Sequence, residues 1–175
     1  MSADTSADRS SGPRAGRPHM PGYGVVDAHG GKGLLPWSWA VDLLSKARDY
    51  WFITTRPDGR PHAMPVWGVW LASRFYFSTG GQSRKAKNIA ANPRCVVGLD
   101  RDLDAVVVEG LAGLVAGVKL RQQFIDAYAV KYDWDMTGFE EPVFVVRPLV
   151  VFGFAEGLEE TATRWIFEEA GRGKE

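Results

Sequence analysis

Residues 75–88 have the sequence Phe-Tyr-Phe-Ser-Thr-Gly-Gly-Gln-Ser-Arg-Lys-Ala-Lys-Asn, and this segment decides how the whole chain is interpreted. Its first three residues are aromatic, which is typical of a strand. Two glycines and Ser83 follow, and a helical segment then begins with three cations in four residues. A strand that leads into a basic helix start is typical of a site for a phosphate group, because free backbone N–H groups and the helix dipole favour an anion there.

The side chains of this strand–helix turn suit an anion. Ser83 can cap the helix by accepting a hydrogen bond from a later backbone N–H. Arg84 offers a planar set of donors and Lys85 a point charge, while Gly80 and Gly81 allow close backbone approach. Cations in a first helical turn oppose the dipole, and a bound anion would remove that conflict. A solvated helix start with surface lysines is the alternative. The glycine-to-lysine spacing is not that of a Walker loop.

The composition is that of one globular domain. The 175 residues, 45% of them hydrophobic, suit a single packed core. The 21 basic and 21 acidic residues cancel, which argues against a general nucleic-acid binder. No segment approaches the ~20 apolar residues of a membrane span, and the N-terminus lacks the apolar core of a secretory signal. We therefore expect a cytoplasmic protein with small-molecule partners, and with neither nucleic acid nor a membrane among its partners.

The single cysteine supports the same location. Cys95 cannot form an internal disulfide, so a reducing compartment fits best. It lies in a strand-like run without an obvious base beside it, which favours a buried structural thiol over a reactive one.

The order of local signals predicts a small β-barrel with helices outside it. Residues 1–33 are rich in Ser, Gly, Pro, Asp and Arg and lack an apolar period, so we expect a disordered tail and a domain over 34–175. Helices are predicted over 37–46, 83–91 and 119–132, and strands over 50–55, 60–70, 74–78, 95–99 and 105–116, with a last hairpin of 142–147 and 149–155 around Pro148. The many short strands favour a barrel.

The second predicted strand is unusual in its prolines. Pro61 and Pro65 are four residues apart, so both missing N–H donors lie along one side of the strand. Two interpretations stay open together: an edge or bulged strand, and a strand whose backbone faces a ligand or a second subunit. Arg60 and His62 share one face, and Arg60 could reach a phosphate from the start of the strand. With no other His or Cys nearby, His62 is not expected to bind a metal.

Four segments, taken together, carry a family resemblance. They are Gly-Arg-Pro-His (59–62), Pro-Val-Trp-Gly-Val-Trp (65–70), Phe-Tyr-Phe-Ser-Thr (75–79) and Ser-Arg-Lys-Ala-Lys-Asn-Ile-Ala-Ala-Asn-Pro-Arg (83–94). In this order they resemble the pyridoxamine 5′-phosphate oxidase-like superfamily, the split β-barrel flavin and deazaflavin proteins. The resemblance spans about residues 37–165, and its first half is most similar to the branch that uses the deazaflavin coenzyme F-420.

The resemblance implies a mainly β, FMN-binding-like split β-barrel that forms a homodimer, with cofactor sites at the subunit interface. The implied cofactor is F-420, with FMN as the alternative. The implied phosphate-binding residues are Ser83, Arg84, Lys85, Lys87 and Asn88, with Arg60 from the turn. His62 is a further candidate for contact with the cofactor, and a structural histidine whose hydrogen bonds are satisfied within the protein is the alternative. The implied ring-binding residues are Met64, Pro65, Val66 and Trp67, with Ser78 and Thr79 from the next strand. The oxidases proper carry a C-terminal motif for the substrate phosphate that residues 164–169 do not match, so vitamin B6 oxidation is not expected.

The implied activity is hydride transfer between reduced F-420 and a small unsaturated organic substrate. Such a reaction needs little side-chain chemistry, because the cofactor carries the reactive carbon. This agrees with a sequence that shows no catalytic triad or carboxylate pair, and no catalytic residue is assigned. Trp67, Trp70, Phe77 and Trp165 could shape a pocket, although each is also a plausible core residue. An FMN oxidoreductase, and a non-enzymatic binder of flavin, F-420 or haem, are the alternatives.

Overall fold

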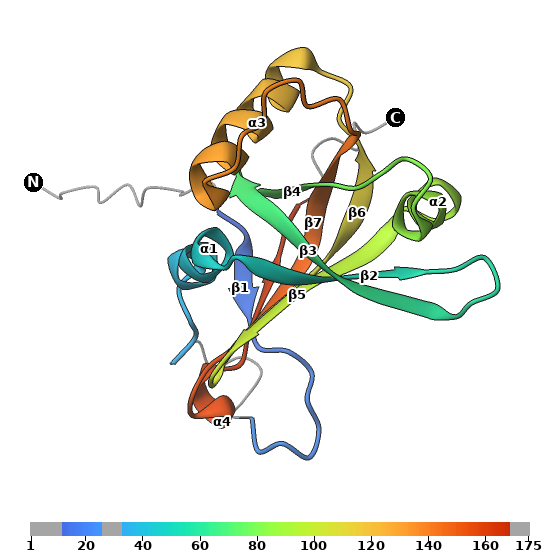
Figure 1. The fold of residues 1–175 in the computed structure, drawn as a ribbon. Coiled ribbons are helices and arrows are strands. Elements are labelled where there is room, and N and C mark those ends of the chain that lie inside the picture. Colours follow the sequence, from blue (N-terminus) through green and yellow to red (C-terminus); the bar gives the residue numbers. More distant parts are fainter. Residues whose placement is uncertain (1–11, 26–32, 169–175) are drawn as a thin grey trace, which may run out of the picture.

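The structure, a computed structural model, describes residues 12–25 and 33–168 (Figure 1). Its strands are β1 (Arg14–Gly16), β2 (Asp49–Thr55), β3 (Pro61–Leu71), β4 (Arg74–Ser78), β5 (Arg94–Arg101), β6 (Asp104–Leu114), β7 (Val143–Phe154) and β8 (Thr163–Ile166). Its helices are α1 (Trp37–Lys46), α2 (Arg84–Ala91), α3 (Val118–Tyr132) and α4 (Leu158–Thr161). Strands predominate, so the fold is mainly β.

Six strands close into an antiparallel barrel. Their hydrogen-bonded order is β7–β4–β3–β2–β5–β6, and β6 pairs with β7 to complete the ring. β7 pairs with β4 through residues 143–146 and with β8 through residues 150–153, so the sheet divides along this strand. β1 adds to the free side of β8. With α1, α2 and α3 placed around the barrel (Figure 1), this arrangement confirms the predicted split β-barrel.

The barrel interior is filled by aromatic side chains from neighbouring strands. Phe52, Phe75 and Phe77 have no exposed surface, and the ring centroids of Phe52 and Phe77 lie 4.4 Å apart. Burying one such side chain stabilises the fold by about 1.5–3 kcal/mol. α1 adds Ala40 and Leu44 to the same cluster, so the predicted apolar face of this helix packs against the barrel core.

The apolar segment near the C-terminus docks into this core through Trp165. Its side chain is 1% exposed, and its ring meets that of Trp37 edge-on at 5.4 Å. Gly153 on β7 makes room for it, because a Cβ there would lie 2.6 Å from the Trp165 ring. Trp165, Trp70 and Phe77 are therefore core residues, and among the four aromatic candidates Trp67 alone is exposed.

The predicted hairpin around Pro148 is wrong, because residues 143–154 form the single strand β7. The register against β6 shifts between Glu109, which faces Val150, and Gly110, which faces Pro148. Leu149 is thus an extra residue, and this bulge accommodates a proline that cannot donate to the ladder. Gly110 permits the close approach, since a Cβ there would lie 2.5 Å from the Arg147 carbonyl oxygen.

The predicted disordered tail must also be corrected over residues 12–25. Arg14–Gly16 form β1, which pairs with β8 in register Ala15 to Trp165. The buried Arg17 guanidinium then donates to the carbonyls of Glu160 and Ala162. Backbone pairing needs no apolar period, so composition alone could not reveal this strand. The rest of the predicted tail, residues 1–11 and 26–32, lies outside the described residues.

A second apolar layer lies outside the barrel under α3. Val69 on β3, Tyr76 on β4 and Val143 on β7 pack there against Phe124 and Tyr132 of the helix. The strands that bear these residues therefore have both faces covered along this part of the barrel. α3 consequently sits close to the point where β3 leaves the barrel as part of the β2–β3 hairpin.

Candidate functional site

The turn between β4 and α2 is a capped helix start. Ser83 is the N-cap, and its Oγ accepts hydrogen bonds from the Ala86 N–H at 3.2 Å and from the Thr79 hydroxyl at 3.1 Å. The Ser78 hydroxyl donates to the Pro142 carbonyl at 2.8 Å. The predicted cap is confirmed. These bonds engage all three hydroxyl groups within the protein, so the three side chains fix the shape of the turn.

One histidine near this helix start lies within the electrostatic influence of three cations. Arg84 and Lys85 come from α2, and Arg56 follows β2. Burial, followed by the charges of Arg56, Lys85 and Arg84, holds the pKa of His62 below its ordinary value. The first N–H groups of α2 also lack intrahelical acceptors. We call these four residues the cationic site, and its charge favours an anionic ligand.

Arg56 is the site residue that the sequence interpretation missed. Its side chain is half-buried, and its buried Nε has no hydrogen-bond partner among the described residues. The hairpin register carries the signal that could have found it. Thr54 pairs with His62, so Arg56, two residues further on, lies on the same face of the hairpin.

Two predicted phosphate ligands lie differently from what was expected. Arg60 is at the exposed hairpin tip, where its guanidinium pairs with Asp58 Oδ2 at 2.7 Å and holds the pKa of that carboxyl below its ordinary value. The prediction for Asn88 is corrected, because its side chain is fully buried and its Nδ2 donates to Thr54 Oγ1 at 2.9 Å. α2 turns Asn88 toward β2, whereas Lys87 points to solvent.

β3 has a free edge beside the cationic site. Among the described strands, residues 61–67 pair with β2 alone, because the pairing with β4 begins at Gly68. Pro61 and Pro65 both lie in this stretch, which confirms the edge-strand interpretation. The β2–β3 hairpin projects from the barrel beside α2 (Figure 1). Its edge is therefore open to a ligand or to a second subunit.

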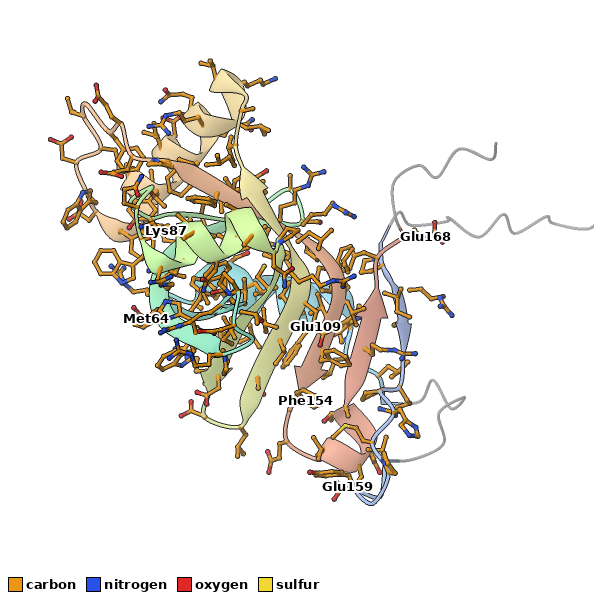
Figure 2. The ribbon with its side chains drawn as sticks, turned by 90° about the vertical axis from the view of Figure 1, so that its right-hand side faces the viewer. Met64, Lys87, Glu109, Phe154, Glu159 and Glu168 are labelled. Carbon is orange, nitrogen blue, oxygen red and sulfur yellow. The ribbon has the colours of Figure 1, made fainter. Side chains whose placement is uncertain are left out.

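The predicted ring-binding residues of β3 lie on two faces. Met64 and Trp67 are each 42% exposed, and strand alternation places them on opposite faces. Pro65 is exposed on the Trp67 face, whereas Val66 is buried in the barrel core and offers a ligand only its backbone. Figure 2 shows Met64 on the side of the barrel that carries α2 and Lys87. A flat ligand along this edge would thus lie between the exposed Met64 and Trp67 side chains.

A cleft of about 370 Å³ opens where the hairpin joins the barrel. Its apolar lining includes Ile53, Val96 and Val150, and Arg94 and Glu109 contribute opposite charges. Glu109 and Phe154 mark this outer face of β6 and β7 in Figure 2. The cleft therefore belongs to the outer surface of the sheet and is continuous with the base of the hairpin.

Neither an accessible thiol nor a metal-binding cluster is found among the described residues. Burial raises the pKa of the Cys95 thiol to about 12, in agreement with a structural thiol. Residues 12–25 and 33–168 contain no group of three or more His, Cys, Asp or Glu that could hold a metal ion. In the same part of the chain, none of the helices combines the length and hydropathy needed to cross a bilayer.

The family model described as pyridoxamine 5′-phosphate oxidase matches residues 40–157, from within α1 to just beyond β7. The chain belongs to the pyridoxamine 5′-phosphate oxidase family. The match includes both the β2–β3 hairpin and the β4–α2 turn, so the elements that form the cationic site are family elements. The predicted superfamily is confirmed. A search of the curated proteins found no match.

Solved structures of similar fold include a reductase, a haem storage protein and a protein of unassigned function. An F420 reductase is 26% identical, with a TM-score of 0.51, over 63% of this chain and 93% of that chain. A conserved hypothetical protein from Mycobacterium tuberculosis is 19% identical, with a TM-score of 0.60, over 80% and 93%. The haem storage protein of Vibrio cholerae is 15% identical, with a TM-score of 0.56, over 63% and 88%. The last two show the fold alone, and the first supports the expected F-420 branch.

Proposed function

We propose that this protein is an oxidoreductase that transfers a hydride between coenzyme F-420 and a small unsaturated organic substrate. The observation that carries the proposal is the cationic site of Arg56, His62, Arg84 and Lys85 beside the free edge of β3. The cationic site suits a phosphate, and the adjacent edge suits a flat ring system. Together they have the shape of an elongated redox-cofactor site.

The residues present fit a phosphate-bearing cofactor. Arg84 and Lys85 add positive charge where the dipole of α2 is already positive, and a phosphate would relieve this repulsion while accepting hydrogen bonds from the first-turn amides. The unpartnered Nε of Arg56 could form a charge-assisted hydrogen bond to the same anion. F-420 and FMN both carry a phosphate. An FMN oxidoreductase of the same fold is therefore the alternative.

The protein would supply position and environment for the reaction. Bound F-420 provides the hydride chemistry. Pro65 leaves a stretch of the β3 edge without an N–H donor, and the exposed side chains of Met64 and Trp67 would exclude water on either side of that edge. The lowered pKa of His62 keeps its imidazole mainly neutral at pH 7, so His62 would act there as a hydrogen-bonding group.

A non-enzymatic binder of haem, flavin or F-420 is the competing class. A haem storage protein shares the fold, and haem iron in many proteins is held by a histidine. His62 is the histidine at the cationic site. The 26% identity with an F420 reductase favours the redox function, and the experiment below includes haem as a competitor.

We also propose that a second copy of the chain covers the outer face of β2, β5, β6 and β7. The register aligns two rows across these strands: Trp51, Gly98, Val107 and Phe152, and Ile53, Val96, Glu109 and Val150. Trp51 is 54% exposed. A mainly apolar surface of this kind, here with the charged Glu109 within it, is typical of a subunit interface. Phe152→Asp should convert a dimer into monomers in sedimentation velocity, and a monomeric wild type would exclude the proposal.

The phosphate assignment is tested with two matched lysines. Lys85 is the second residue of α2, and Lys119 is the second residue of α3. Lys85→Ala should weaken F-420 binding by about 5- to 150-fold, which corresponds to the loss of one charge-assisted hydrogen bond. Lys119→Ala should leave the affinity unchanged, because Lys119 is not among the charges that act on His62 at the cationic site. Affinities are measured by quenching of tryptophan fluorescence.

The outcomes separate the three classes. Preferential binding of F-420, followed by turnover of cyclohex-2-enone with reduced F-420, supports the proposal. Tighter binding of FMN, with a flavin spectrum in the purified protein, favours the alternative. Binding of haem that is lost in His62→Ala, without turnover, favours storage or transport. Equal F-420 affinities for Lys85→Ala and the wild type would show that the cationic site does not hold the phosphate.

A further inference from the structure

A second cleft, of about 470 Å³, lies between α1, β3 and α3, three elements that adjoin one another in Figure 1. Its lining residues are Val69, Trp70 and Leu71 of β3, Ser45 of α1, and Asp126, Ala127, Val130 and Lys131 of α3. This volume is in the range of small-molecule sites. We call it the α1–α3 cleft. It shares no lining residue with the cationic site or with the face assigned to a second copy, so it is a separate feature of the molecule.

Lys131 is the cation of this cleft, and neutral groups hold its ammonium. Its Nζ donates to the Tyr50 hydroxyl at 2.8 Å and to the Gly68 carbonyl at 2.9 Å. The Tyr50 hydroxyl in turn donates to the Ala47 carbonyl at 2.8 Å. Burial raises the pKa of Tyr50, so this hydroxyl stays uncharged. The ammonium is therefore hydrogen-bonded but not neutralised.

The Lys131 ammonium also lacks an anionic partner in the described part of the chain. The ion pairs found over residues 12–25 and 33–168 do not include it. Burial, followed by the charge of Arg48, lowers its pKa to about 8, whereas a carboxylate close by would raise it. A half-buried cation that no anion compensates has lost hydration without an equivalent return. A bound anion would reduce that cost.

One hydrogen-bond donor of Lys131 is available to a ligand. An ammonium has three N–H groups, and two of them are engaged by Tyr50 and Gly68. Gly68 directly precedes the cleft residue Val69 on β3. The Tyr50 hydroxyl contacts the Leu44 carbonyl, directly before the cleft residue Ser45. The ammonium thus lies at the junction of the same three elements that enclose the cleft, and its third N–H can serve an acceptor there.

The other charges determine the polarity of the cleft. The Arg48 guanidinium donates to the Lys131 carbonyl at 3.1 Å, which places a second cation at this end. Asp126 lies five residues earlier on α3, roughly 7.5 Å along the helix axis. It is exposed, accepts from Gln122 Nε2 at 2.8 Å, and is not among the charges that act on Lys131. An anionic group is therefore favoured at the Lys131 end and disfavoured at the Asp126 end.

The carboxylates around the end of α3 do not change this polarity. Asp49, Asp133 and Asp135 are exposed, lie outside the cleft lining and are not among the charges that act on Lys131. Asp49 Oδ1 accepts from Trp67 Nε1, and Asp135 Oδ1 accepts from the Thr137 N–H. On α1, the Asp42 carboxylate pairs with Lys46 at 2.7 Å. The Lys131 ammonium therefore keeps an unmatched charge.

We propose that the α1–α3 cleft binds a monocarboxylate with an apolar chain, its carboxylate on Lys131 and its chain along Val69, Ala127 and Val130. Charge complementarity carries this choice of ligand. The uncompensated ammonium selects an anion, the lining selects an apolar body, and Asp126 disfavours a second carboxylate. The third N–H of Lys131 would form a charge-assisted hydrogen bond to the ligand. The site goes beyond the proposed function, because neither the cationic site nor residues 61–67 contribute to it.

The first test uses the wild-type full chain without cofactor and probes that share one eight-carbon chain. Octanoate should bind in titration calorimetry. Octylammonium and 1-octanol should bind more weakly by about tenfold or more, as expected for the loss of a charge-assisted hydrogen bond. Octanedioate should also bind more weakly than octanoate, and Asp126→Asn should narrow that difference. These comparisons leave Lys131 unchanged, so a folding defect cannot explain them.

The second test changes the cleft itself. Lys131→Met keeps a chain of similar length and should abolish the preference for octanoate over 1-octanol. Ala127→Leu should weaken octanoate binding by filling the cleft while leaving the ammonium in place. Lys119→Met is the matched control, because Lys119 is an exposed lysine in the first turn of the same helix and outside the cleft lining. It should leave the octanoate affinity within twofold of the wild type. Bound octanoate should also raise the pKa of Lys131 in NMR titrations.

Four results would overturn the site. They are the absence of octanoate binding, equal wild-type affinities for octanoate and 1-octanol, equal effects of Lys131→Met and Lys119→Met, and unchanged octanoate binding in Ala127→Leu, which would place the ligand elsewhere. If Lys131→Met does not unfold cooperatively, the wild-type probes and Ala127→Leu decide. Failure of F-420 to bind would reject the proposed function and leave these comparisons unaffected.

Discussion

Replacing Tyr132 with Phe should test how α3 is held on the barrel. The hydroxyl of this buried residue accepts from the Gly68 N–H at 2.9 Å and donates to the Arg48 carbonyl at 2.7 Å. Without it, the Gly68 carbonyl keeps the Lys131 ammonium at 2.9 Å, but the buried Gly68 N–H loses its acceptor. An unsatisfied buried amide costs about 1–3 kcal/mol, so the free energy of unfolding should fall by that amount.

The measurement is urea unfolding with linear extrapolation, together with thermal unfolding. For a chain of this length, the same loss should lower Tm by roughly 2–12 °C, and an unchanged m-value would show that the effect lies in stability. Tyr128→Phe is the matched control, because Tyr128 packs against the Tyr132 ring at 4.5 Å on the same helix. It should cost less than about 0.5 kcal/mol. Equal unfolding midpoints for the two variants would refute this account of the hydroxyl.

Three further predictions concern titration. His62 should titrate below pH 6.5 in NMR spectra, because burial, followed by the charges of Arg56, Lys85 and Arg84, lowers its pKa. Lys85→Gln or bound phosphate should raise the pKa of His62. A pKa that neither change moves would contradict the cationic site. Burial, followed by the Arg48 charge, lowers the pKa of Lys131 from 10.5 to about 8. Between pH 8 and pH 10.5, Lys131 is therefore more often protonated in the unfolded chain than in the folded one. The free energy of unfolding of the wild type, relative to that of Lys131→Met, should rise with pH over this range in urea titrations. A relative free energy that falls with pH would show that folding raises the pKa of Lys131 instead. Cys95, with its pKa raised to about 12 by burial, should react with a disulfide reagent at pH 8 only after unfolding, and rapid labelling of the folded protein would show an accessible thiolate.

Local signals sufficed where a short segment determines its own structure. The apolar spacing predicted a helix over 37–46, the same bounds as α1. Ser83 caps α2 as its residue type suggested. An N-cap depends on a hydrogen bond between residues only three positions apart in the sequence, so the local sequence is enough to predict it. The prolines of β3 also identified a free edge correctly, since the lack of an N–H at Pro61 and Pro65 is a property of the residue itself.

Local signals failed where a partner distant in the sequence decides the structure. Pro148 suggested a turn, but the bulge opposite Gly110 keeps β7 continuous. Residues 12–25 looked unstructured, yet β1 is ordered by pairing with β8, about 150 residues away. Asn88 had the residue type of a ligand, and only the packing of α2 on β2 shows that it bonds Thr54 inside the barrel.

The sequence by itself determined the family, the barrel class and the residue types that suit a phosphate, because these depend on motifs and on local hydrogen-bonding capacity. The tertiary structure decided which of those residues meet. Hairpin register brings Arg56 to His62, and the end of α3 brings Trp134 to Trp67. These contacts depend on strand pairing and on helix packing between segments that lie far apart in the sequence. No single segment of the sequence therefore determines them.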